Sequence, residues 1–207
     1  MLQSEVVNIL DFKLASKAHR LAQKLLNEAT KNEPLITEHL KAIAKSINAE
    51  IVGLESKLKS TKSLERKLKN ESIKRKIPIE RIAKRNNDAL RYTFIFAEKE
   101  YAEGLIKVIS ALEKYGYEIP RRRIWNAWDL ADLETDSGYR GINTTIISSQ
   151  KQKFELQFHT KESFWLKTET HVLYEELRLP QTSAERTIEI LRIILPLAAQ
   201  IQRPRGI

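Results

Sequence analysis

An acid and an amide stand two positions apart in a strand-like run of the sequence. Glu155 and Gln157 belong to a short segment, 154–158, in which apolar and polar residues alternate. Alternation along a strand places Glu155 and Gln157 on one face and the three apolar side chains on the other. If the apolar face is buried against helices, the opposite face presents a carboxylate and an amide side by side on a rigid support. Such a pair suits the binding of a metal ion or of a hydroxyl group.

A second carboxylate, Asp88, comes just before the run Leu90–Phe96, whose aromatic and β-branched residues predict a strand. An Asp at the start of a strand usually forms a turn or a cap. Paired with Glu155, it gives two carboxylates from different strands, which can hold Mg²⁺ while phosphate oxygens complete the octahedron. The sequence leaves both interpretations of Asp88 open.

The positive charge of the chain is concentrated in residues 57–85. This segment has twelve Lys or Arg residues and three Glu residues, an excess of nine that equals the net charge of the whole chain, +9. It is either a solvated helical face or a surface for a polyanion, and phosphates are the first candidate. If the segment is helical, Lys59, Ser63 and Lys67 lie near one face, and the two ammonium groups can cradle a triphosphate.

Two further groups of polar residues have open roles. Three consecutive arginines, Arg121–Arg123, either protect an exposed sheet edge or reach a nucleotide. His171 and Glu175 are one helical turn apart, a spacing that is typical of a pair on a helix surface.

The order of these motifs resembles the synthetase domain of the RelA/SpoT family. The features that carry the resemblance are the Gly138-Tyr139 turn, the four residues from Tyr139 to Asn143, the Glu-x-Gln strand with Thr160 after it, and a helix with His171 and Tyr174. The match runs roughly from Glu55 to Arg178. Members of that family transfer pyrophosphate from ATP to the 3′-hydroxyl of a nucleotide, so the resemblance implies a Mg²⁺-dependent pyrophosphokinase.

The resemblance also implies a role for each candidate residue. Glu155 would bind Mg²⁺ with Asp88 and draw the proton from the acceptor hydroxyl, while Gln157 supports it and Tyr139 stacks on the acceptor base. ATP would contact a basic set: Lys57, Lys59, Ser63, Lys67 and Arg91. The rest of the acceptor site would comprise Arg140, Asn143 and His171.

The sequence departs from the family pattern at several of these positions. Lys57 stands where an Arg is usual, Asn143 stands where a His is common, and Arg91 comes earlier in its strand than the family's Arg. The segment Asp129–Asp136 is acidic, with Glu134 within it, where relatives place lysines that hold the acceptor phosphates. We therefore expect a guanosine 5′-triphosphate to bind poorly.

The acceptor itself is left open. The candidates are GDP or GTP, ADP or ATP, and the 3′-terminal adenosine of a tRNA, which would make the protein a toxin of this family. An antitoxin or immunity partner and a homo-oligomer also remain open. The alternative to an enzyme is a non-catalytic module of the same fold that binds RNA or a nucleotide through residues 57–85.

Hydrophobic periodicity predicts the elements that position these residues. We expect helices over 6–29 and 36–59, separated at Pro34, and further helices over 77–83, 98–115, 161–177 and 182–201. We expect strands near 90–97, 118–127, 141–148 and 153–159, the last two forming a hairpin. The fold class is therefore α+β, with a single mixed β-sheet covered by helices, and the resemblance implies the nucleotidyltransferase-like synthetase fold.

The chain of 207 residues is expected to form one domain, 1–207, with N-terminal helices (1–56), a catalytic core (57–178) and a C-terminal helix (182–203). No His-Asp dipeptide occurs, so we expect a synthetase without the hydrolase domain of longer relatives. The absence of cysteine excludes thiolate chemistry and disulfides. No membrane span or signal peptide is expected, and the predicted location is the cytoplasm, with export as a toxin left open.

Overall fold

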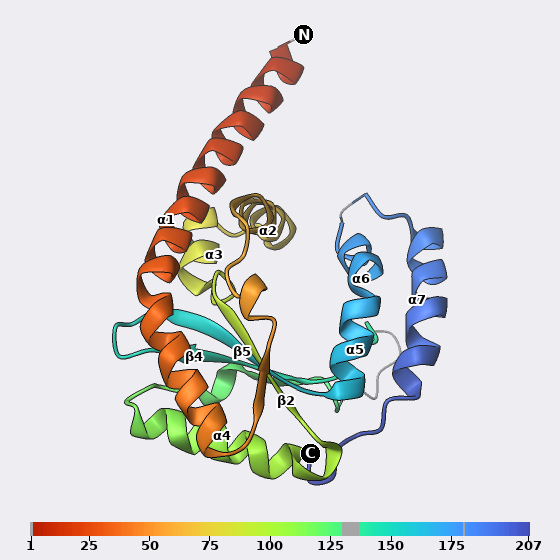
Figure 1. Cartoon of the computed structure of the whole chain (residues 1–207). Coiled ribbons are helices and arrows are strands. Elements are labelled where there is room, and N and C mark those ends of the chain that lie inside the picture. The colour runs from red at the N-terminus through yellow and green to blue at the C-terminus, as the bar shows by residue number, and fades with distance from the viewer. Residues whose placement is uncertain (1, 130–136, 180) are drawn as a thin grey trace.

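The computed structural model describes residues 2–129, 137–179 and 181–207, with side chains from residue 12 onward. Within these ranges, one mixed sheet of five strands has the order β1-β2-β5-β4-β3 (Figure 1). Strands β2 and β5 are parallel, and the other neighbours are antiparallel. The strands are β1 (Glu50–Val52), β2 (Arg91–Phe96), β3 (Ile124–Asn126), β4 (Ile142–Ile147) and β5 (Lys153–Thr160).

Helices lie on both faces of the sheet. Within the described ranges they are α1 (Leu2–Ser46), α2 (Thr61–Arg75), α3 (Ile79–Arg85), α4 (Tyr101–Lys114), α5 (Lys161–Glu169), α6 (His171–Leu177) and α7 (Ala184–Ala199). In Figure 1, α2 and α3 lie above the left side of the sheet, and α5, α6 and α7 lie above its right side. This arrangement confirms the predicted α+β class.

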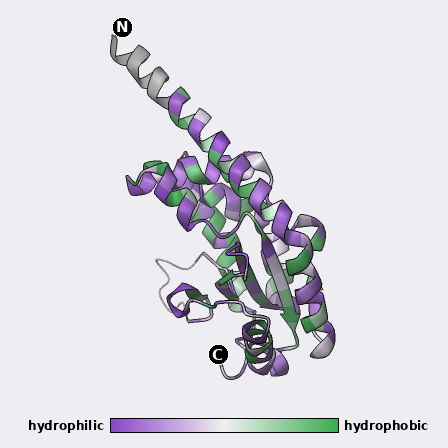
Figure 2. Ribbon diagram, turned by 90° about the vertical axis from the view of Figure 1, so that its left-hand side faces the viewer, coloured by the Kyte–Doolittle hydropathy of each residue, from purple (hydrophilic) through white to green (hydrophobic). Residues whose placement is uncertain are grey.

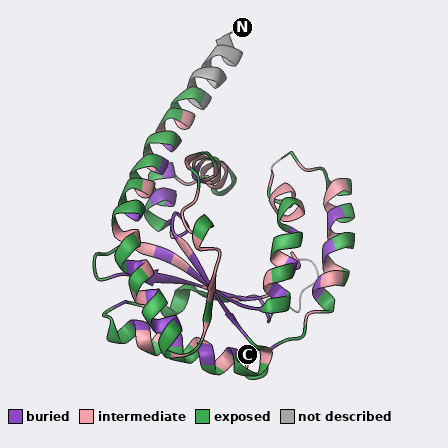
Figure 3. Cartoon of the chain, viewed as in Figure 1, coloured by how far each residue is buried: buried purple, intermediate pink, exposed green. Residues whose placement is uncertain are grey.

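The apolar face of the sheet is covered by α1 and α4. The Tyr92 hydroxyl on β2 lies 2.7 Å from Thr37 Oγ1 on α1, and the Tyr101 hydroxyl on α4 donates to the Phe158 carbonyl at 2.7 Å. Helix α4 approaches β2 so closely that a Cβ on Gly104 would clash with the ring of Phe96. Buried residues are concentrated in the strands and on the inward sides of these helices (Figure 3). The coloured part of α1 carries both polar and apolar residues (Figure 2).

The register of the strands aligns the polar residues of the opposite face. Arg91 on β2 pairs with Glu155 on β5, and Thr145 on β4 pairs with the same Glu155 from the other side. The next polar row holds Gln157 between Thr93 and Asn143. The alternation predicted for β5 therefore places the acid and the amide at the centre of the sheet.

The N-terminal helix is continuous, and the predicted break at Pro34 is wrong. Pro34 lies inside α1. Ala29 and Ile36, on either side of it, are fully buried in the same core. We infer that their burial outweighs the cost of about 3 kcal/mol that a proline imposes inside a helix.

The segment after α1 also differs from the prediction. The helix ends at Ser46 instead of Lys59, Asn48 adopts a left-handed conformation with φ 54°, and β1 then pairs with β2 as an edge strand. Lys57 and Lys59 precede α2, whose first residue is Thr61 and whose N-cap is Ser60. The prediction that Lys59, Ser63 and Lys67 share a helical face is therefore wrong for Lys59.

Two other elements are shorter than predicted. Pro120 is followed by a 3₁₀ turn, Arg121–Arg123, which leaves only β3 of the strand expected over 118–127. The helix expected over 161–177 is divided at Thr170 into α5 and α6. The hairpin of β4 and β5 is confirmed. Along the described parts of the chain, every helix is too short or too polar to cross a bilayer.

Candidate active site

A cleft of about 1390 Å³ opens on the polar face of the sheet, between α2 and the α5–α6 pair. Its floor is formed by β2, β4 and β5, and β3 contributes one edge. Of the residues predicted for the site, all but Lys57 line this cleft: Lys59, Ser63, Lys67, Asp88, Arg91, Tyr139, Arg140, Asn143, Glu155, Gln157 and His171. Segments far apart in sequence are thus brought to one place.

Lys57 lies outside the cleft lining. Its Nζ is 3.3 Å from Glu33 Oε1 on α1, and its carbonyl accepts a hydrogen bond from the Arg91 backbone at 2.8 Å. The ATP contact that the resemblance implied for Lys57 stays a prediction, because its side chain turns to α1 and lies outside the cleft lining. We infer that Lys57 anchors the segment before α2 to α1.

Asp88 lies at the centre of a cluster of cations. Its Oδ2 is 2.9 Å from the Nζ atoms of both Lys59 and Lys67 and 3.5 Å from Arg91 Nη2. Its Oδ1 accepts from Asn86 Nδ2 at 2.7 Å. Burial works to raise the pKa of Asp88, but the neighbouring cations, Lys67 first, outweigh it and hold that pKa well below its usual value.

Arg91 joins Asp88 to Glu155. Its Nε donates to Glu155 Oε2 at 2.6 Å, while its Nη2 faces Asp88 Oδ2. The parallel pairing of β2 with β5 puts Arg91 directly opposite Glu155. The position of Arg91, early in its strand, therefore places one guanidinium between the two carboxylates.

Gln157 connects Glu155 to a lysine that sequence reasoning missed. Gln157 Nε2 donates to Glu155 Oε2 at 3.1 Å, and Lys167 Nζ donates to Gln157 Oε1 at 2.6 Å. Burial, helped by Arg91 and partly offset by Glu155, lowers the pKa of Lys167 to about 8. The only sequence signal for Lys167 is its place on α5, which starts directly after β5 at a capping box formed by Thr160 and Ser163.

Tyr139 is held more tightly than the resemblance implies. Its ring is stacked against Trp125, with centroids 5.3 Å apart and planes 18° apart. Its hydroxyl donates to Asn143 Oδ1 at 2.6 Å and lies 2.8 Å from His159 Nε2. One face of Tyr139 is therefore occupied by Trp125, which is 41% exposed and also lines the cleft.

His159 supports Tyr139 from inside the protein. It is fully buried, and its Nδ1 lies 2.9 Å from Ser163 Oγ. Burial and then the nearby Lys167 lower the pKa of His159 well below its usual value, so the ring is neutral at physiological pH.

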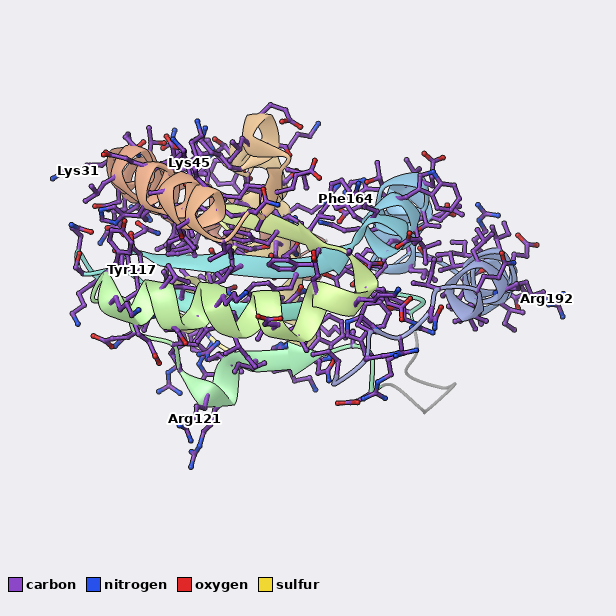
Figure 4. All side chains as sticks on the ribbon, turned by 60° about the horizontal axis from the view of Figure 1, so that its bottom comes forward. Lys31, Lys45, Tyr117, Arg121, Phe164 and Arg192 are labelled. Carbon is purple, nitrogen blue, oxygen red and sulfur yellow. The ribbon has the colours of Figure 1, made fainter. Side chains whose placement is uncertain are left out.

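The remaining predicted residues line the acceptor side of the cleft. Arg140 Nη1 contacts the Tyr139 carbonyl at 2.9 Å, and His171 begins α6. Of the three arginines, Arg122 and Arg123 line the cleft, whereas the Arg121 side chain extends away from the molecule (Figure 4). The predicted acidic segment lies outside the described residues, apart from Asp129, which pairs with Arg203.

The two walls of the cleft are joined by an ion pair. Arg66 Nη2 on α2 lies 2.6 Å from Glu175 Oε2 on α6. Glu175 therefore pairs with Arg66 across the cleft. The predicted helix-surface pair of Glu175 with His171 is not formed in this structure.

The carboxylates fit a magnesium ion only in combination with a ligand. Within the described ranges, no three His, Cys, Asp or Glu side chains come together in a group that could hold a metal. Asp88 and Glu155 do offer hard oxygen ligands on the cleft floor. Mg²⁺ commonly uses one or two carboxylates together with substrate phosphates, so these residues suit a metal that arrives with a phosphate.

Solved structures share the fold of this chain. Searches of family models and of curated proteins give no match. Small alarmone synthetase 1 from Bacillus subtilis, bound to its product pppGpp, is 11% identical with a TM-score of 0.54, over 84% of this chain and 88% of that one. A GTP pyrophosphokinase family protein from Streptococcus pneumoniae is 14% identical with a TM-score of 0.51, over 86% and 89%.

A third similar structure is a bacterial effector. The type VI effector Tas1, solved in complex with its immunity protein, is 17% identical with a TM-score of 0.52, over 86% of this chain and 96% of that one. The resemblance to RelA/SpoT synthetases is thus confirmed in the fold: the chain has the architecture of the small alarmone synthetases.

Proposed function

We propose that this protein is an ATP-dependent pyrophosphokinase, which transfers the β,γ-pyrophosphate of ATP to a ribose 3′-hydroxyl. The acceptor is a nucleotide or the 3′ end of a tRNA. The observation that carries the proposal is the continuous network on the cleft floor, in which Lys59 and Lys67 contact Asp88, and Arg91 links Asp88 to Glu155.

The charge of this network supports a polyphosphate ligand. Lys59, Lys67 and Arg91 contact the carboxylates of Asp88 and Glu155, and Lys167 contacts the neighbouring Gln157, so four cations accompany two carboxylates on the floor. Partly buried ammonium and guanidinium groups bind phosphate strongly because their hydrogen bonds are assisted by charge. The same excess of positive charge would repel a free metal ion.

On this proposal, Lys59 and Lys67 contact Asp88 in the protein without ATP and would turn to the phosphates of ATP once it binds. Asp88 and Glu155 would then hold Mg²⁺, which supplies charge neutralisation for the transferred phosphates when it is bound.

Glu155 would act on the acceptor. It accepts the proton of the 3′-hydroxyl while the oxygen forms a bond to the β-phosphorus of ATP, and the bond from that phosphorus to the α,β-bridging oxygen breaks. AMP leaves, and the proton passes from Glu155 to solvent. Positioning and charge stabilisation would supply most of the acceleration, as is usual for phosphoryl transfer.

A second hollow favours a polynucleotide among the acceptors. It measures about 370 Å³ and shares Lys67, Asn87 and Arg123 with the main cleft, and its lining adds Arg75, Arg85 and one acidic residue, Glu71. A basic track that continues out of the cleft suits a nucleic-acid backbone. A cytoplasmic location, a homo-oligomer and an immunity or antitoxin partner stay predictions.

The test is a transfer assay with separate acceptors. The protein is incubated with Mg²⁺ and ATP labelled at the γ-phosphate, together with GDP, GTP, ADP, ATP or deacylated tRNA. We expect label on one acceptor class and loss of transfer in Glu155→Gln. If no acceptor is labelled while ATP or RNA still binds, the non-catalytic module replaces the enzyme.

A further inference from the structure

Lys167 lies over the floor of the cleft because α5 follows β5 without a loop. Thr160 is both the last residue of β5 and the N-cap of α5, and its Oγ1 accepts from the Ser163 backbone at 3.1 Å. The helix therefore returns over its own strand. Lys167 Nζ donates to Gln157 Oε1 at 2.6 Å and lies 5.2 Å from the centroid of the Phe164 ring; Phe164 projects from α5 in Figure 4.

The contacts of Lys167 are unusual for a lysine. Within the described ranges, its Nζ is not within ion-pair distance of any carboxylate, and its hydrogen bond goes to a neutral amide. Burial lowers its pKa to about 8, a value that still leaves the ammonium form dominant at neutral pH. Burial of a cation costs free energy, so we expect the contact between Lys167 and Gln157 to have a function that offsets this cost.

The chemistry of the groups decides how the Gln157 amide is oriented. An ammonium group can only donate, so the oxygen of the amide must face Lys167. Thr93 Oγ1 lies 3.4 Å from the same oxygen and also donates. The amide nitrogen is thereby directed to Glu155 Oε2, 3.1 Å away.

This orientation controls which oxygen of Glu155 is available. Arg91 Nε and Gln157 Nε2 both donate to Oε2. A flipped amide would present its oxygen to the carboxylate, and two acceptors would then repel each other. The Lys167 contact thus keeps Oε2 saturated with donors and leaves Oε1 to meet a ligand.

We propose that Lys167 is a positioning residue, which locks the Gln157 amide and so presents Glu155 Oε1 to the acceptor hydroxyl. The proposal rests on the pyrophosphokinase function for its catalytic consequence, but the locked amide is a property of the protein without substrate.

A double-mutant cycle tests the catalytic consequence. Lys167→Met keeps an unbranched apolar stem and removes the ammonium group, and Gln157→Met removes the amide. We expect each to lower kcat by about 10- to 100-fold with a smaller change in KM, and the double variant to be no slower than Gln157→Met alone. Losses that multiply in the double variant would overturn the proposal. Lys161→Met, an exposed lysine on the same helix, is the matched control.

Nuclear magnetic resonance tests the locked amide without any turnover. The side-chain NH₂ signals of Gln157 are assigned by their disappearance in Gln157→Met. We expect these signals to shift in Lys167→Met and to stay in place in Lys161→Met; unchanged signals in Lys167→Met would overturn the proposal. If the signals shift and the wild type transfers nothing to any acceptor, the pyrophosphokinase function fails and the locking contact stands.

Discussion

The two oxygens of Glu155 have different surroundings. The hydrogen bonds from Arg91 and Gln157 both end on Oε2. Two donors fix this carboxylate on one side, and its other side faces the cleft. It can therefore accept a proton without changing its rotamer. A general base must first lie within hydrogen-bond reach of the proton that it takes, and this fixed orientation meets that requirement.

Glu155→Gln is therefore the sharpest substitution at the residue scale. The change keeps the shape of the side chain and removes the charge needed for the metal and the proton. We expect transfer to fall by at least about 100-fold, while the protein stays folded with a lower melting temperature, because Arg91 loses its charged partner at 2.6 Å. Glu113→Gln, an exposed position on α4, is the control. Wild-type turnover in Glu155→Gln would remove Glu155 from the mechanism.

Asp88→Asn should destabilise the protein in a way that depends on pH. The pKa of Asp88 in the folded protein lies well below its unfolded value, because Lys67, Lys59 and Arg91 outweigh burial. The contribution of Asp88 to the free energy of unfolding is therefore fully present above about pH 3.9 and is lost as the pH falls further. Removal of one partner from a buried ion cluster costs about 3 kcal/mol.

The measurement for Asp88 is the free energy of unfolding between pH 7 and pH 3. The difference in free energy of unfolding between wild type and Asp88→Asn should be constant near pH 7 and shrink below about pH 4. A difference that is independent of pH over this range would show that the charge of Asp88 does not stabilise the fold.

At the scale of elements, periodicity was sufficient wherever one face of a segment is buried and the other is not. Polar and apolar residues alternate in the sequence of β5, and its hairpin with β4 and the placement of Glu155 and Gln157 on one face could be predicted. The continuity of α1 through Pro34 could not, because it depends on burial of Ala29 and Ile36 against distant parts of the chain.

Part of the site was also beyond prediction from the sequence. Lys59 and Lys67 were identified by charge and by resemblance, but Lys57 carries the same charge and lies outside the cleft, because its ammonium group faces Glu33 on α1. Lys167 has no motif at all. Its contact with Gln157 arises because Thr160, the last residue of β5, is also the N-cap of α5.

Helix α2 and the segment before it should bind the donor. Lys59→Ala and Lys67→Ala each remove one ammonium group from the cleft, and we expect the KM for ATP to rise by about tenfold or more, with a smaller effect on the KM for the acceptor. Lys62→Ala is the matched control, because Lys62 is exposed on the same helix and does not line the cleft. An unchanged KM for ATP in both variants would make this segment a solvated face.

At the scale of the whole molecule, the excess charge of the chain and the cleft coincide. The excess positive charge of residues 57–85 equals the net charge of the whole chain, +9. Helix α2, the main element of this segment, forms one wall of the cleft. The acceptor side, formed by α5, α6 and the edge of β3, combines Lys167, Arg122 and Arg123 with the exposed Trp125. A donor on the basic wall and an acceptor against the aromatic edge would meet above Glu155.

The most direct test of this account is the identity of the nucleotide released from ATP. The protein is incubated with ATP, Mg²⁺ and each acceptor, and all products are separated and weighed by mass spectrometry. We predict one AMP for every acceptor that gains two phosphates, with both products lost in Glu155→Gln. Release of ADP with a single phosphate transferred, or no AMP with any acceptor although ATP binds, would contradict pyrophosphate transfer in this cleft.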